Sequence, residues 1–131
     1  MAVGMSAESE KTVSESDVAL FARVTGDMNP VHLDPEAAAR SVFGGRVAHG
    51  MLTASLISAV MAMKLPGPGT IYLSQSLRFL APVRIGDTVT ARVEIAELVA
   101  EKHRARLITT CRNQRGEPVL DGEATVKVPA Q

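Results

Sequence analysis

The sequence predicts an α+β fold in which an antiparallel sheet wraps around one long central helix. Residues 50–63, GMLTASLISAVMAM, carry no charge and are apolar on most faces, which is typical of a helix buried all round. After residue 70 the apolar period changes to two, which predicts strands with one buried face each. Wrapping such a sheet around such a helix buries both apolar surfaces.

Composition sets limits on function. The 131 residues, 46% of them hydrophobic, predict one domain over 1–131. Fourteen Lys and Arg balance fourteen Asp and Glu, so no excess positive charge attracts nucleic acid or an anionic membrane. The one cysteine, Cys111, cannot form an internal disulfide, and the first residues are too acidic for a secretory signal. We therefore expect a soluble, cytoplasmic protein with no nucleic-acid or membrane partner.

Two short helices are predicted before the central one. Residues 14–26, SESDVALFARVTG, begin with a Ser-x-x-Asp cap and end at a glycine. A second helix starts at Asp34, followed by Pro35 and Glu36. Residues 26–33 bridge the two, and Pro30 favours an extended backbone before it. The central helix ends at LPGPGT, residues 65–70, which cannot continue a helix.

Four strands follow, each with one apolar side. Turn residues at 84–87 and 113–116 indicate antiparallel neighbours. The apolar sides are Ile71, Leu73, Leu77 and Phe79; Val89, Ala91, Val93 and Ile95; Ala105, Leu107, Thr109 and Cys111; and Gly122, Ala124, Val126 and Val128.

The bridge between the short helices, GDMNPVHLD at 26–34, concentrates titratable chemistry. For Asp27 and Asn29 the residues alone leave a choice between ordinary turn chemistry and a functional site. For Asp34 the structural reading, a helix N-cap before Pro35, is the better one. His32 brings an imidazole able to exchange protons near neutral pH.

Three stretches in order carry a family resemblance: FARVTGDMNPVHLDPEAA, VAHGMLTASLISAVM and QSLRFLAPVRIGDTV. With them the chain resembles the MaoC-like (R)-specific enoyl-CoA hydratases, which have the hotdog fold. The resemblance implies a single hotdog unit that adds water to a trans-2-enoyl-CoA to give a (3R)-3-hydroxyacyl-CoA. It further implies Asp27 and His32 as the catalytic pair, a homodimer, and no metal or organic cofactor.

The reaction needs a base, a proton for the α carbon and a partner for the enolate oxygen. We expect His32 and Asp27 to share the proton transfers, in an order that the sequence leaves open. The N–H of Gly50, at the start of the central helix, is the predicted oxyanion donor. His49 is expected to be buried and to support that turn, with Asn29 and Ser58 as further supporting residues.

The acyl chain is expected along the central helix, and the CoA phosphates at the mouth. The candidate pocket residues are Leu56, Val60, Met61 and Val126. Several basic residues are candidate phosphate contacts: Arg40, Arg46, Lys64, Arg78, Arg84 and Lys102. The methionines Met51, Met61 and Met63 are expected in the core.

Other readings remain open at this stage. Asp27, His32, Asp34 and His49 could form a metal site, which the absence of a His-x-x-x-His spacing disfavours. The same fold could hydrolyse acyl-CoA thioesters or bind acyl-CoA without catalysis. Chain length and metabolic pathway, either fatty-acid breakdown or polyhydroxyalkanoate precursor supply, are not determined by the residues.

Overall fold

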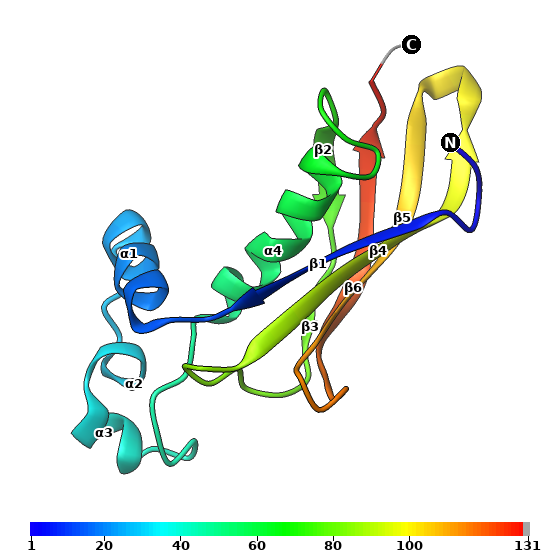
Figure 1. The fold of residues 1–131 in the computed structure, drawn as a ribbon. Coiled ribbons are helices and arrows are strands. Elements are labelled where there is room, and N and C mark those ends of the chain that lie inside the picture. The colour runs from blue at the N-terminus through cyan, green and yellow to red at the C-terminus, as the bar shows by residue number, and fades with distance from the viewer. Residues whose placement is uncertain (130–131) are drawn as a thin grey trace.

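In the computed structural model, which describes residues 1–129, one six-stranded sheet curves around helix α4 (Gly50–Met63) (Figure 1). All strand pairs are antiparallel, in the order β1-β4-β5-β6-β2, with β3 also paired to β6. The predicted α+β architecture with one central helix is therefore confirmed. Three short helices, α1 to α3, lie together on one side, away from the sheet (Figure 1).

The three short helices follow the predicted signals, with one addition. Helix α1 (Glu15–Thr25) has the predicted capping box at Ser14 and ends at Gly26 in the left-handed region. Asp34 caps α3 (Pro35–Ala39) through its carboxylate, as predicted. The bridge contains a further helix, α2 (Pro30–Leu33). It was not predicted because only four residues form it, with proline at its first position.

The strands are β1 (Ser6–Thr12), β2 (Ile71–Gln75), β3 (Arg78–Phe79), β4 (Thr88–Val99), β5 (Arg104–Arg112) and β6 (Pro118–Lys127). A short 3₁₀ helix (Ala100–Lys102) joins β4 to β5. Strand β1 was not predicted. Its sequence, SAESEKT, is polar because it forms the edge of the sheet beside β4 and packs little more than Ala7 against the core.

The prediction of one buried side holds for three of the four predicted strands. Val89 to Ile95 on β4 and Ala105 to Cys111 on β5 bury their predicted sides almost completely, and on β6 Ala124 and Val126 are buried. The first predicted strand is instead broken into β2 and β3. The prediction that its apolar side is buried is wrong, because Ile71, Leu73 and Phe79 are 54%, 44% and 55% exposed. These residues lie on β2 and β3, beyond which no further strand pairs within residues 1–129.

Helix α4 is buried on one side only. Ile57, Val60 and Met61 are in the core, whereas Met51 and Met63 are 56% and 72% exposed, which corrects the prediction that they are core residues. None of the helices within residues 1–129 is long and apolar enough to cross a membrane.

Candidate active site

The first predicted catalytic residue, Asp27, follows directly on the C-cap of α1. Its N–H donates to Thr25 Oγ1 at 3.1 Å, and its Oδ1 accepts the N–H of Asn29 at 3.2 Å. Asn29 in turn caps α2 by accepting the N–H of Val31 at 3.2 Å. Asp27 and Asn29 therefore make the local turn hydrogen bonds that the sequence suggested, and these bonds hold the exposed Asp27 carboxylate in place.

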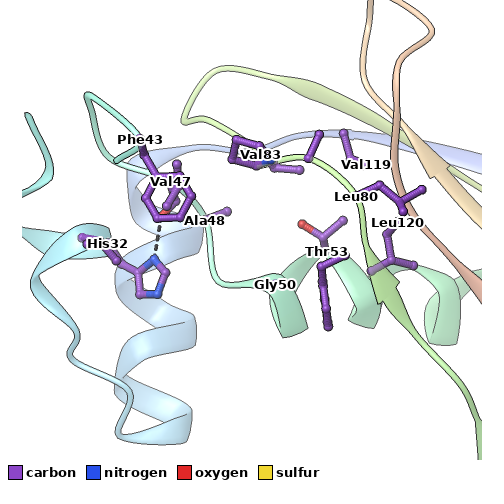
Figure 2. A pocket seen from close by; sticks show the side chains of 14 residues that line it. His32, Phe43, Val47, Ala48, Gly50, Thr53, Leu80, Val83, Val119 and Leu120 are labelled. Atoms are coloured by element: carbon purple, nitrogen blue, oxygen red, sulfur yellow. Dashed lines mark hydrogen bonds between the residues drawn. The ribbon is translucent and has the colours of Figure 1, made fainter. Parts of the chain in front are cut away.

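His32 lies on α2 and is oriented by a backbone carbonyl. Its Nδ1 is 2.7 Å from the Val47 carbonyl oxygen (Figure 2). A carbonyl oxygen only accepts, so Nδ1 carries the proton of the neutral ring. The free lone pair is therefore on Nε2, the state required of a general base.

His49 lies behind His32 and is 2% exposed. Its Nε2 donates to the Asp27 carbonyl oxygen at 3.0 Å, and its ring stacks on that of His32 with centroids 3.8 Å apart. Phe21 packs on it as well, at 4.9 Å. Within the described chain its Nδ1 has no hydrogen-bond partner. As predicted, His49 is a buried, hydrogen-bonded residue next to the start of α4.

Gly50 begins α4 and leaves donors unpaired. The first backbone bonds of the helix are donated by Leu52 and Thr53 to the His49 carbonyl, and the Gly50 N–H has no acceptor within residues 1–129. A Cβ at Gly50 would lie 2.7 Å from Cε1 of Phe79. Glycine therefore leaves room for the aromatic ring to approach the helix end, and a larger residue there would require the Phe79 ring to move.

Two cavities meet at this point. One, of about 400 Å³, is lined by Asp27, His32, His49, Gly50 and Phe79, together with residues of α1 and α4. The other, of about 440 Å³, shares His32, Gly50 and Phe79 and continues as an apolar hollow (Figure 2). The catalytic candidates therefore lie where the two cavities meet, and the positive N-terminal end of α4 points toward this place.

A model of the MaoC-like domain family matches residues 2–114. The chain belongs to this family. It is 58% identical to the 3-hydroxybutyryl-CoA dehydratase of Methylorubrum extorquens, over 97% of this chain and 80% of that protein. It is 55% identical to the (R)-specific enoyl-CoA hydratase of Rhodospirillum rubrum, over 98% of this chain and 88% of that protein.

A solved structure is similar over the same range. The (R)-hydratase from A. caviae, described as involved in PHA biosynthesis, matches this MaoC-like chain with a TM-score of 0.96 and 46% identity over 98% of each chain. With this match, the sheet wrapped around α4 confirms the predicted hotdog fold.

The predicted acyl-pocket residues of this MaoC-like chain do not line either cavity. Val60, Met61 and Val126 are 1% exposed or less and belong to the closed core. Leu56 lines a separate groove beneath α1. Ser58 lines another hollow, of about 650 Å³, between α4 and β2. Met51 lines this hollow and also borders the candidate active site.

Sequence reasoning missed the residues that form the cavity walls. They come from the loop before α4 and from the segments around β3 and β6: Phe43, Val47, Phe79, Leu80, Val83, Val119 and Leu120. Apolar residues in loops have no periodicity to mark them, and Phe79 was assigned to a buried strand face. Its exposure beside a glycine at a helix start could be recognised only in three dimensions.

Ligand atoms of Asp27, His32 and His49 lie within 4.8 Å of one another, so a metal site must be considered. The two imidazole planes are 26° apart and stacked. Imidazole lone pairs lie in the ring plane, so nearly parallel rings do not direct them at one ion about 2 Å away. The arrangement fits proton transfer better than metal ligation.

Proposed function

We propose that this MaoC-like chain is an (R)-specific enoyl-CoA hydratase, which adds water to a trans-2-enoyl-CoA to give a (3R)-3-hydroxyacyl-CoA. The observation that carries the proposal is the shared cavity: the Asp27 carboxylate, the His32 ring and the start of α4 at Gly50 all line it. The relatives named for this activity support the hydratase prediction over the thioesterase one.

The protein groups divide the reaction as follows. One water lies between Asp27 and the unprotonated Nε2 of His32. This Nε2 accepts a proton from the water as the water oxygen bonds to C3 of the substrate. A proton returns to C2 from the same pair, the carbon-carbon double bond becomes single, and both side chains regain their starting states. Because one water supplies both groups, hydroxyl and hydrogen add to the same face.

The developing enolate needs a donor at the thioester oxygen. The N–H of Gly50, which has no acceptor among the described residues and lies at the positive end of α4, is that donor. His49 supports it in two ways: it precedes Gly50 in the chain, and it holds the Asp27 carbonyl at 3.0 Å. The His49 side chain thus links the residue next to the proposed oxyanion donor to the backbone of Asp27.

The direct test is an assay with crotonyl-CoA. Hydration removes the conjugated absorbance without releasing thiol, thioester hydrolysis releases free CoA, and a binding protein does neither. The product should be oxidised by a dehydrogenase specific for (3R)-hydroxyacyl-CoA. A racemic or (3S) product would contradict the proposed position of the water.

The roles are tested by substitution. Asp27→Asn and His32→Gln keep the side-chain size and should each lower kcat by about a hundredfold to ten-thousandfold. The double variant should lose much less than the product of the two losses, because both groups act on one water. Asp34→Asn is the matched control on the same segment, since an amide still caps α3 and activity should largely survive.

We further propose that the enzyme is a homodimer joined along β2. Strand β2 is the last strand of the sheet, and β1 is the other edge. The β1 edge, Ser6–Thr12, carries charges that discourage further pairing. The edge formed by β2 and β3 instead presents exposed apolar side chains: Ile71 and Leu73 on β2, Phe79 on β3, and Leu80 directly after it. A second copy would extend the sheet and cover them.

Light scattering at micromolar concentration tests the dimer. Wild type should have twice the mass of the chain, and Leu73→Lys should shift it toward the monomer by placing a charge on the β2 edge. Leu20→Lys is the control, because Leu20 is 58% exposed but lies on α1. A monomeric wild type would refute the dimer. The cytoplasmic location stays a prediction.

A further inference from the structure

We propose that Arg46 is a positioning residue that fixes His32 for catalysis. The inference rests on the proposed hydratase function and on contacts that the sequence did not predict. Arg46 had been a candidate for binding CoA phosphate. Its side chain is only 17% exposed, and its guanidinium is already engaged by groups of the chain itself.

The guanidinium connects two elements. Its Nε donates to the backbone carbonyl of His32 at 2.8 Å, and its Nη1 lies 2.6 Å from a carboxylate oxygen of Glu15 on α1. The planar fork of arginine fixes the spacing of two donor nitrogens, Nε and Nη1, one for each acceptor, whereas an ammonium presents its donors from a single nitrogen. Arg46 therefore ties the His32 turn to the first turn of α1.

Arg46 belongs to a short segment, 46–49, that contacts both catalytic candidates. Within it, the Val47 carbonyl accepts from His32 Nδ1 at 2.7 Å and the Val47 N–H donates to the Val31 carbonyl at 3.2 Å. His49 donates to the Asp27 carbonyl at 3.0 Å. Helix α2, with four residues, is too short to hold its own position. Arg46 supplies the side-chain bond that keeps His32 facing Val47, and so keeps the lone pair on Nε2.

The effect should appear in turnover rather than in binding. Displacing a catalytic group by about 1 Å can cost about a hundredfold in rate. Loss of one of several bonds on the turn should be milder, so Arg46→Gln is expected to lower kcat about tenfold while KM changes less than about threefold. Glu15 is the more exposed partner, with 74% of its side chain accessible. Glu15→Gln should therefore change kcat less than about twofold.

The second readout is the tautomer of His32, measured by long-range proton–nitrogen NMR on the full-length protein without substrate. Wild type should show a single Nδ1-protonated form, and Arg46→Gln a mixture of tautomers. This readout does not depend on the reaction. If wild type fails to hydrate crotonyl-CoA, the proposed function is refuted while the tautomer still decides the role of Arg46.

Two further variants sharpen the test. Arg46→Lys keeps the charge but not the fork, so it should behave like Arg46→Gln and carries the test if that variant does not fold. Arg112→Gln is the matched control, because Arg112 also donates to a backbone carbonyl, that of Gly116 at 2.9 Å after the end of β5, and it is not a candidate phosphate contact. It should keep wild-type kcat and tautomer. The proposal is overturned if Arg46→Gln retains wild-type kcat and the single tautomer, if Arg46→Lys restores both, or if Arg112→Gln loses as much as Arg46→Gln.

Discussion

The buried thiol of Cys111 predicts a specific loss of stability at high pH. Cys111 lies on β5 with no exposed surface, and burial raises its pKa from 9.0 to about 12. The unfolded chain releases this proton near pH 9, whereas the folded chain retains it until about pH 12. The protonated thiol therefore makes its full contribution to the free energy of unfolding below pH 9. This contribution falls by about 1.4 kcal/mol for each pH unit as the pH rises toward 12.

Urea unfolding followed by circular dichroism at pH 8 to 11 measures this loss. By pH 11 wild type should have lost about 3 kcal/mol more than Cys111→Ala, because that variant has no thiol to titrate. The smaller alanine side chain lowers the free energy of unfolding by the same amount at every pH, so it does not affect the change with pH that is compared. Parallel stability profiles for the two proteins would refute the reasoning, since they would mean that the thiol titrates equally in both states.

Three further predictions concern single residues. Gly122→Ala should destabilise the fold by about 2 kcal/mol or more in urea unfolding, because its Cβ would lie 1.8 Å from the Ser76 carbonyl oxygen. Burial opposes ionisation of Asp87, yet hydrogen bonds from Gln114 and the Arg84 N–H lower its pKa overall. Its contribution to the free energy of unfolding is present above about pH 4 and is lost as the pH falls further, so Asp87→Asn should be less stable than wild type at pH 7, and the difference should shrink on acidification. Gly50→Ala should keep the fold, because the exposed Phe79 ring can move, and lower kcat in the crotonyl-CoA assay.

Local signals determined what the sequence could predict. The caps at Ser14 and Asp34 and the uncharged run of α4 depend on neighbouring residues, and the structure places α1, α3 and α4 where they indicate. Strand β1 has no such signal, because an edge strand in contact with solvent needs few apolar residues. Its existence depends on pairing with β4, more than seventy residues away.

In the candidate site, too, the residues marked by a local sequence signal were predicted and the others were not. Asp27 and His32 could be identified because both occur in one short segment with a family resemblance, and the structure brings them to one cavity. The acyl-pocket prediction placed the acyl chain along α4, which carries Leu56, Val60 and Met61. In this fold Val60 and Met61 face a closed core. The cavity opens instead where loops leave space at the helix end.

The way α4 begins links its stability to its function. Helices α1 and α3 start with side-chain caps, Ser14 and Asp34, whereas His49 makes no capping bond to the N-terminal N–H groups of α4. A capping side chain is worth about 1 kcal/mol, and this helix forgoes it although it forms the centre of the fold. A serine or aspartate at that position would occupy the donors that now face the cavity. The uncapped start is therefore consistent with an N–H group kept free for a thioester oxygen, while the His49 side chain is used to hold Asp27.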